Sequence, residues 1–242
     1  MITSTSNGQI KKIQQLLKKS RTRKEEGLFV AEGIKMFREA PPERIEKIYL
    51  GASFAEKGTW REILREKGLE EKAESLTEVV EDKVFKSLSD TVTPQGVLCL
   101  IRIKESTLEE MIPEEKPALL MILEDLQDPG NLGTILRTGE GAGVTGIILS
   151  KNSVDIYNPK VIRSTMGSVY RVPFCYTSSI QEEILPWLRE KKITGYAAHL
   201  EGKNSYDQED YTKAAAFFIG NEGNGLSREL SQKADIWIRI RM

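Results

Sequence analysis

From residue 118 onward, short apolar segments alternate with longer segments that have helical periodicity. We expect strands at Ala118–Leu123, Gly146–Leu149, Val172–Tyr176, Thr194–Ala198, Ala215–Ile219 and Ile236–Ile240, with helices near residues 132–142, 180–191 and 227–233. Strands that alternate with helices in this way predict a mostly parallel sheet covered on both faces. Ligands of such sheets bind at the carboxyl ends of the strands.

The first hundred residues predict a separate, small α/β unit. Strands are expected at residues 27–33, 44–50 and 96–103, and a charged amphipathic helix at residues 54–67. The segment after them is acidic, contains Pro113 and is followed by Pro117, which is typical of a linker. We therefore predict a first domain at residues 1–103, a linker at 104–116 and a second domain at 117–242.

Composition excludes several chemistries. Cys99 and Cys175 each lie in an apolar, strand-like context and are expected to be buried, reduced thiols. His199 is the only histidine, lies at a predicted strand end and is expected to be structural, so no zinc or other metal site is predicted. No apolar run reaches the roughly 20 residues of a membrane helix, and the N-terminus has no export signal. We expect a cytoplasmic protein.

The net charge of −1 excludes a uniformly basic nucleic-acid binder, so any such binding needs a local patch. Residues 8–24 form one, with Ile10, Ile13, Leu16 and Leu17 on one apolar stripe of a predicted helix. Its basic side chains are Lys11, Lys12, Lys18, Lys19, Arg21, Arg23 and Lys24, without an acid among them. The patch is either a solvated helix face or an arm that contacts RNA phosphates.

The first unusual loop follows the strand that ends at Leu123. Asp128-Pro129-Gly130 predicts a turn, and Asn131 is placed to be the N-cap of the next helix. Arg137 follows by nearly two helical turns on roughly the same side, either as a functional cation or as a salt-bridge partner of Asp125 or Glu140. The glycine-rich string at residues 139–143 ends a helix and is therefore not a phosphate cradle.

The second unusual loop runs from the strand at Ala215–Ile219 into Gly220-Asn221-Glu222-Gly223-Asn224-Gly225. Its three glycines allow the backbone to approach a ligand closely. The loop lacks the Gly-Lys-Ser/Thr of a nucleotide phosphate loop, and Glu222 would repel phosphates. A ligand with adenosine but no phosphate fits better, and the alternative is a plain strand-to-helix turn.

Three segments together resemble the SpoU or TrmH-type family of RNA ribose 2′-O-methyltransferases, in the knotted SPOUT superfamily: NLGTILRT, DIYNPKVIRSTMGSVYRVP (Asp155–Pro173) and FIGNEGNGLS. The N-terminal SRTRKEEGLFVAEG is similar to that family's ribosomal-protein-like substrate-binding domain. The resemblance spans nearly the whole chain. It implies a trefoil-knot fold, bound S-adenosylmethionine, a homodimer with composite active sites, and methyl transfer to a ribose 2′-oxygen.

The resemblance also implies roles for particular residues. Asn131, Arg137 and Glu222 fall on catalytic positions; Leu200, Gly220, Asn221, Gly225, Ile240 and Met242 on cofactor-binding positions; and Ser164 and Ser168 on the RNA side. We expect 23S-type ribosomal RNA as the substrate. A transfer RNA 2′-O-methyltransferase and a non-catalytic RNA-binding or ribosome-assembly protein on the same scaffold are the alternatives. A nucleotide-dependent oxidoreductase is disfavoured because neither glycine string has the dinucleotide-binding pattern.

The chain departs from the family at its last motif, which there continues through a proline into a closing helix. Here it reads Ile238-Arg239-Ile240-Arg241-Met242, with Arg241 where proline is expected and without that helix. We expect the sequence to be an incomplete version of an active enzyme. The alternative is a shortened protein that binds RNA without methylating it.

Overall fold

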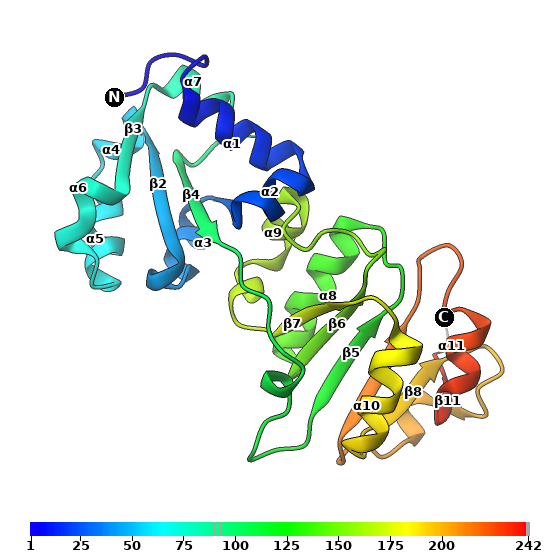
Figure 1. Ribbon diagram of the computed structural model, residues 1–242. Helices are drawn as coiled ribbons and strands as arrows, with labels where there is room; N and C mark the ends of the chain where they lie inside the picture. Colours follow the sequence, from blue (N-terminus) through cyan, green and yellow to red (C-terminus); the bar gives the residue numbers. More distant parts are fainter. Residues whose placement is uncertain (90, 92, 241–242) are drawn as a thin grey trace. The chain divides into compact units, whose positions relative to one another are not determined.

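The computed structural model describes residues 1–89, 91 and 93–240, and these fold into two compact units. One comprises Met1–Lys104 with Tyr157–Tyr170, and the other Glu105–Ile156 with Arg171–Met242 (Figure 1). This division by contacts differs from the predicted domains in two places. The segment predicted as a linker belongs almost wholly to the second unit, and Tyr157–Tyr170, predicted in the second domain, packs with the first.

The first unit is a four-stranded mixed sheet with short helices. Its strands are β1 (Leu28–Glu32), β2 (Ile45–Gly51), β3 (Thr77–Val80) and β4 (Val97–Arg102), in the order β1-β4-β2-β3. Its helices are α1 (Gly8–Lys18), α2 (Ser20–Glu26), α3 (Ile34–Glu39), α4 (Ala52–Ala55), α5 (Thr59–Glu66), α6 (Ala73–Leu76), α7 (Asp82–Lys86) and α9 (Pro159–Thr165). β4 is antiparallel to β1 and β2, whereas β2 and β3 are parallel. The three predicted strands are confirmed, and β3 was not expected from the sequence.

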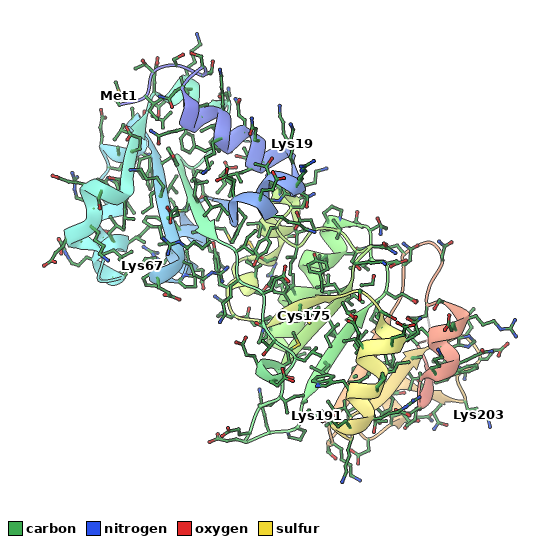
Figure 2. The ribbon with its side chains drawn as sticks, viewed as in Figure 1. Met1, Lys19, Lys67, Cys175, Lys191 and Lys203 are labelled. Atoms are coloured by element: carbon green, nitrogen blue, oxygen red, sulfur yellow. The ribbon has the colours of Figure 1, made fainter. Side chains whose placement is uncertain are left out.

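The basic N-terminal segment forms two helices where one was predicted. The chain leaves the helical region at Lys19, with φ −122° and ψ 114°, between α1 and α2 (Figure 2). Arg23 of α2 is only 3% exposed, and its Nη1 donates to the Leu16 carbonyl at 2.6 Å. It thus binds the carbonyl end of α1, where unsatisfied acceptors gather.

Aromatic packing joins the segment Tyr157–Tyr170 to the first unit. The Phe29 ring, which is fully buried in β1, lies 4.5 Å from the ring of Tyr157 and 6.3 Å from that of Tyr170. The Arg44 guanidinium lies over the Tyr170 ring, 5.9 Å from its centroid. Both ends of the segment are therefore anchored to the same small sheet.

The second unit contains a seven-stranded sheet with the order β7-β6-β5-β10-β8-β11-β9. The strands are β5 (Leu119–Leu123), β6 (Gly146–Ser150), β7 (Phe174–Thr177), β8 (Thr194–Ala198), β9 (Asn204–Ser205), β10 (Ala215–Ile219) and β11 (Ile236–Arg239), and the helices are α8 (Pro129–Gly141), α10 (Leu185–Glu190) and α11 (Arg228–Lys233). Every neighbouring pair is parallel. The predicted parallel α/β sheet is confirmed, and only the two-residue β9 was not expected.

Helices lie on both faces of this sheet. Leu120 and Ile122 point into the core that contains Trp187 of α10 and Leu230 of α11. Leu119 and Met121, which alternate with them, line an apolar groove beside Ile135 of α8. Among the described residues, every helix is too short or too polar to span a bilayer.

The predicted linker is part of this core. Residues 109–111 form a 3-10 turn, and Met111 is fully buried. A Cβ atom added at Gly146 would lie 2.4 Å from Met111 Cγ, so the side chain fills the space that the glycine leaves. The sequence did not predict the burial of Met111, because a single methionine among glutamates gives no periodic hydrophobic pattern.

We predict that Met111→Ala lowers the free energy of unfolding by about 2–5 kcal/mol, the range for truncating a buried methionine. Glu110→Ala, at an exposed position of the same turn, is the control and should change it by less than about 0.5 kcal/mol. Urea unfolding followed by circular dichroism measures both. Equal effects of the two substitutions would show that residues 104–116 are a linker after all.

Candidate active site at the carboxyl edge of the parallel sheet

Helix α8 begins directly after the turn that follows β5. Asp128 is its N-cap, with Oδ1 accepting from the Asn131 amide at 2.8 Å, and Pro129 occupies the first helical position. The prediction that Asn131 is the cap is therefore wrong. Asn131 lies in the first turn, and its exposed side chain is available for other contacts.

Glu222 of the glycine loop binds the entrance of α8. Its carboxylate accepts from the amides of Gln127 at 3.0 Å and Asp128 at 2.8 Å, and from Asn131 Nδ2 at 3.2 Å. Two predicted catalytic residues, Asn131 and Glu222, are thus brought into direct contact although 91 residues separate them.

Glu124, at the end of β5, makes the reciprocal contact. Its carboxylate accepts from the amide and the hydroxyl of Ser227, each at 2.7 Å, and Ser227 is the N-cap of α11. Each loop therefore sends one carboxylate to the start of the helix that follows the other loop. We call this pair of contacts, made by Glu124 and Glu222, the carboxylate exchange. Sequence reasoning missed Glu124, whose only signal was its place at the end of a buried strand.

A third strand end joins the site through Asp125. This residue has φ +53°, which is uncommon for a residue other than glycine. Ser150, at the end of β6, donates to its carboxylate at 2.7 Å and accepts from its amide at 2.8 Å, while Asn221 Nδ2 donates to its carbonyl at 2.9 Å. The surrounding contacts hold a backbone conformation that costs free energy, as is common at functional sites.

The glycine loop folds closely on itself. Asn221 and Gly225 exchange backbone hydrogen bonds at 3.1 and 2.8 Å, and the Asn221 Oδ1 accepts from the amides of Gly223 and Asn224. A Cβ atom at Gly220 would lie 2.1 Å from the Gly225 carbonyl carbon, and Gly225 has φ +68°. Glycine at these two positions is required by the loop's own backbone, before any ligand is considered.

The hydrogen bonds to Glu222 set its ionisation. Partial desolvation raises the pKa of the Glu222 carboxyl. The hydrogen bonds from the amides of Gln127 and Asp128, from its own amide and from the Asn131 side chain lower it by more, so the net pKa is about 2. Glu222 is therefore a carboxylate at neutral pH that accepts hydrogen bonds, and it does not exchange a proton there.

A pocket of about 360 Å³ lies where these loops meet. It is lined by Glu124, Asp125, Gln127, Asn221, Asn224, Gly225 and Ser227. Two of these side chains are carboxylates and none is basic. The pocket therefore favours a ligand that carries positive charge and disfavours phosphate.

Two predicted cofactor-binding residues lie exposed at strand ends on the same edge. Leu200, after β8, is 80% exposed, and Ile240, after β11, is 50% exposed. Apolar side chains that face solvent beside an acidic pocket suit a ligand with an aromatic base and a cationic group. Met242, the remaining predicted cofactor residue, lies outside the described residues.

Arg137 is exposed on α8, two turns after Asn131. Glu140, offered as its salt-bridge partner, pairs with Arg171, and Asp125 binds Ser150. Within residues 1–89, 91 and 93–240, the Arg137 guanidinium has no ion pair. The salt-bridge alternative is therefore wrong, and the cation is left facing solvent.

The predicted RNA-contacting residues separate into two groups. Lys11, Lys18, Lys19 and Lys24 are exposed, Lys12 pairs with Glu26 at 2.6 Å, and Arg21 pairs with Glu25 at 2.7 Å. The prediction that Arg23 and Ser168 contact RNA is not supported, because both side chains are buried. Arg23 binds the carbonyl end of α1, and the Ser168 hydroxyl donates to the Thr165 carbonyl. Ser164 is partly exposed, but its hydroxyl donates to carbonyls within α9.

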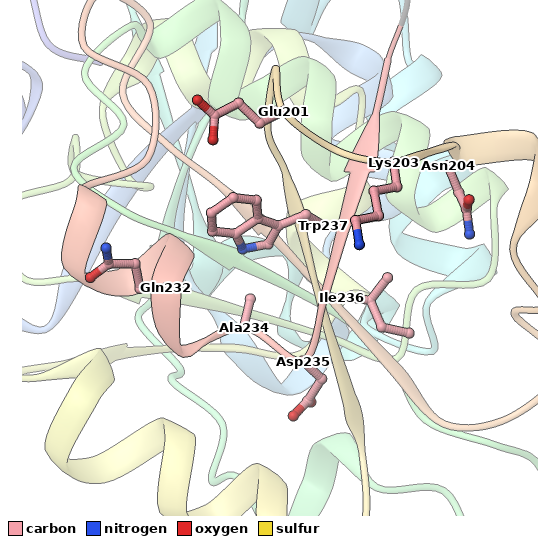
Figure 3. A pocket seen from close by; sticks show the side chains of 8 residues that line it. All are labelled: Glu201, Lys203, Asn204, Gln232, Ala234, Asp235, Ile236 and Trp237. Carbon is pink, nitrogen blue, oxygen red and sulfur yellow. The ribbon is translucent and has the colours of Figure 1, made fainter.

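A larger pocket, of about 620 Å³, lies beside β11 and contains none of the predicted site residues. Figure 3 shows Trp237 between Gln232 and Glu201 in this pocket. The Trp237 ring stacks on His199, with centroids 4.2 Å apart, and its Nε1 donates to the Ser231 carbonyl. His199 thus has the structural role expected of it, and size does not identify the functional pocket.

Metal and thiol chemistry find no support in the described part of the chain. No group of three His, Cys, Asp or Glu side chains there is arranged to hold a metal ion. Burial raises the pKa of the Cys99 thiol well above its usual range and that of Cys175 to about 12. Both thiols are therefore protonated and poor nucleophiles.

The fold and the pocket are those of an α/β protein that binds a cationic ligand at the carboxyl edge of its sheet, and comparison with known sequences identifies the family. Residues 118–242 match the SpoU rRNA Methylase family, and residues 7–99 match the MRM3-like substrate binding domain. The chain belongs to the SpoU rRNA methylase family, whose cofactor is S-adenosylmethionine. This molecule carries a sulfonium cation and adenosine without phosphate, which fits the acidic pocket and the exposed apolar side chains.

Individual proteins similar to this chain are also named as RNA methyltransferases. The 23S rRNA (guanosine(2553)-2′-O)-methyltransferase RlmP of Bacillus subtilis (strain 168) is 28% identical over 65% of this chain and 60% of its own length. An uncharacterised tRNA/rRNA methyltransferase of Synechocystis, slr1673, is 32% identical over 93% of this chain and 80% of its own length. The AdoMet-bound rRNA methyltransferase from Sinorhizobium meliloti is 30% identical, with a TM-score of 0.84 over 100% of this chain and 88% of that one. The match to the Bacillus enzyme thus spans less than two thirds of that protein.

We predict that the stabilisation from Glu222 depends on pH. Its pKa is lowered from 4.5 to about 2 in the folded state, so the unfolded state binds the proton more tightly and stability rises with pH across this interval. The contribution is fully present above about pH 4.5 and is lost as the pH falls towards 2. Wild type should therefore unfold at higher urea than Glu222→Gln at pH 7, with a difference that shrinks by pH 3.

The control is Glu229→Gln, an exposed glutamate of α11 paired with Lys233. It should shift the urea midpoint little at either pH. A Glu222→Gln difference that stays constant from pH 7 to pH 3 would contradict the assigned role of the carboxylate.

Proposed function

We propose that this chain transfers a methyl group from S-adenosylmethionine to a ribose 2′-hydroxyl of RNA, with 23S-type ribosomal RNA as the substrate. The observation that carries the proposal is Arg137, an exposed cation without an ion pair among the described residues. It lies on α8, whose first turn is bound to the glycine loop through Glu222. Six residues along a helix place Arg137 about 9 Å from Asn131 along the axis.

The bound cofactor supplies an electrophilic methyl group on a sulfonium sulfur. With this group bound, the ribose oxygen would take the methyl group, the sulfur would keep the electron pair of the broken bond, and the hydroxyl proton would leave to solvent. Arg137 holds an RNA phosphate and stabilises the negative charge that develops on the oxygen. A guanidinium has a pKa above 12, so a base role does not suit it. Asn131 orients the hydroxyl, and Glu222 fixes Asn131 and α8.

The remaining parts of the proposal concern binding. Leu200, Gly220, Asn221, Gly225 and Ile240 surround the adenosine end of the cofactor, and the exposed lysines of α1 and α2 contact RNA phosphates. The active form is a cytoplasmic homodimer, for which the apolar groove beside α8 offers a surface. The Bacillus relative supports the 2′-oxygen and the 23S target.

The experiment that tests this function uses methyl-labelled S-adenosylmethionine and unmodified total RNA. After digestion, the labelled nucleoside is identified, and the ribosomal and transfer RNA fractions are counted separately. A labelled 2′-O-methylnucleoside from ribosomal RNA is the expected result. Label on transfer RNA would change the substrate, label on a base would overturn the 2′-oxygen, and bound RNA without label would favour a non-catalytic scaffold.

Removing the guanidinium should slow the chemical step. We predict that Arg137→Ala lowers kcat by about 10²–10³-fold, or roughly 2.7–4 kcal/mol, the cost of one preorganised charge-stabilising donor. Arg189→Ala, at an exposed position of α10, is the matched control and should leave kcat within about twofold of wild type. Single-turnover methylation measures both, and near-full turnover of Arg137→Lys would show that the guanidinium geometry is irrelevant.

The exposed lysines of the basic patch at residues 8–24 should contribute to the affinity for RNA. We predict that Lys18→Ala with Lys19→Ala weakens RNA binding and reduces the slope of log K against log salt by about 0.7–0.9 for each phosphate that the arm no longer neutralises. Filter binding across a salt series measures the slope. The matched pair Lys83→Ala with Lys86→Ala, exposed on α7, should keep the wild-type slope. If both pairs change the slope equally, the arm is only a solvated helix face.

A further inference from the structure

The first unit has a pocket of its own that none of the predicted RNA-contacting residues lines. It has a volume of about 370 Å³ and lies at the carboxyl end of β1. Its walls come from the turn into α3, from Thr91, Thr93 and Gln95, and from Arg163 and Met166 at α9. This volume is at the low end of the roughly 300–1,000 Å³ of small-molecule sites, which suits a ligand about as large as one nucleotide.

The charged groups of the pocket suit a phosphate at its rim. Lys35 of α3 is exposed, and Arg163 of α9 also lines the pocket. Arg163 belongs to the segment in which the family resemblance placed RNA contacts at Ser164 and Ser168. The structure turns Ser168 inward and leaves Arg163 and Met166 on the pocket.

Polar groups inside the pocket complement the edge of a base. Gln95 Oε1 accepts from the Ile34 amide at 2.7 Å, which leaves Nε2 as a donor. Glu32 Oε1 accepts from the hydroxyls of Ser89 and Thr91. Neither Gln95 Nε2 nor Glu32 Oε2 has a hydrogen-bond partner elsewhere in the described chain. A donor beside an acceptor is the pattern that a nucleobase edge pairs with.

Two methionines supply the apolar walls. Met36 of α3 is 4% exposed, whereas Met166, just after α9, is 40% exposed and has φ +52°. A thioether packs readily on an aromatic ring. Met166 is the C-cap of α9, and its left-handed conformation ends that helix and leaves its side chain on the pocket.

We propose that this pocket binds one unstacked nucleotide of the RNA substrate, with Lys35 and Arg163 on the phosphate, Met36 and Met166 on the faces of the base, and Glu32 and Gln95 on its edge. The inference rests on the proposed function in taking RNA as the ligand. Single-stranded RNA is commonly recognised through bases that leave the stack in this way.

Methyl NMR of the protein labelled at its methionine methyl groups tests the pocket directly. The probes are guanosine, cytidine and uridine 5′-monophosphates, because adenosine has a second site at the cofactor pocket. The expected result is that Met36 and Met166 signals shift on titration, while those of Met111 and Met121 in the second unit do not. Ribose 5-phosphate, which lacks the base ring current, should shift them less.

Variants assign the contacts. Lys35→Glu should weaken nucleotide binding at least about tenfold, as expected for removing a charge-assisted hydrogen bond. Lys72→Glu is the matched control. Lys72 is exposed and precedes β3, so it lies at the amino end of the parallel pair β2 and β3, whereas the pocket lies at the carboxyl end of β1. This variant should bind the nucleotides as the wild type does. Glu32→Gln should weaken the monophosphates and leave ribose 5-phosphate unchanged.

The possible outcomes distinguish a failed pocket from a failed proposed function. Unshifted Met36 and Met166 signals with all three monophosphates, or equal weakening by Lys35→Glu and Lys72→Glu, would overturn the pocket while methylation of RNA still stands. If ribose 5-phosphate shifted the Met36 and Met166 signals as much as the monophosphates do, the pocket would be a site for anions only. That result would also overturn the proposed nucleotide pocket. If the pocket binds, Lys35→Glu should also raise KM for RNA at unchanged kcat.

Discussion

Two glutamates join the loops that follow β5 and β10, because each binds the start of the helix that follows the other loop. The geometry of the carboxyl edge of the sheet depends on these contacts. Glu222 accepts from amides at the start of α8, and Glu124 accepts from the N-cap of α11. Carboxylates are favoured at helix N-termini because unsatisfied amides and the helix dipole meet them there. Hydrogen bonds of this charged kind contribute about 1.5–3 kcal/mol each, so losing either carboxylate loosens both loops.

The carboxylate exchange explains why acidic side chains gather at this pocket. The carboxylates are used to fix the loops, and Glu124 together with Asp125 gives the pocket a negative lining. Such a lining attracts a cation such as the sulfonium group of S-adenosylmethionine and disfavours phosphate, for which we propose Arg137 instead. Glu222, with a pKa of about 2, is ionised at neutral pH and a weak proton acceptor, and its carboxylate holds the Asn131 side chain by a hydrogen bond.

The family's middle motif has two sets of tasks in this chain. Its aromatic ends, Tyr157 and Tyr170, anchor it to the small mixed sheet through Phe29. Its polar centre lies on the pocket that also contains Lys35 and Gln95. A segment that a linear reading assigns to the methyltransferase domain therefore completes the substrate-binding unit, which ties the proposed RNA recognition to a motif outside residues 1–104.

The sequence by itself determined the parallel sheet, because short apolar runs that alternate with helical segments are typical of βαβ units, whose strands are buried on both faces. It also pointed to Asn131, Arg137 and Glu222 as candidate catalytic residues, since their motifs are local. It failed where the deciding partner is remote or the burial is not periodic: Arg23, Ser168 and Met111 are buried, and Asp128 replaces Asn131 as the cap. Only the tertiary structure decided that Glu124 reaches Ser227 and Glu222 reaches Asp128, 103 and 94 residues away, because a hydrogen bond across strand ends leaves no pattern along the chain.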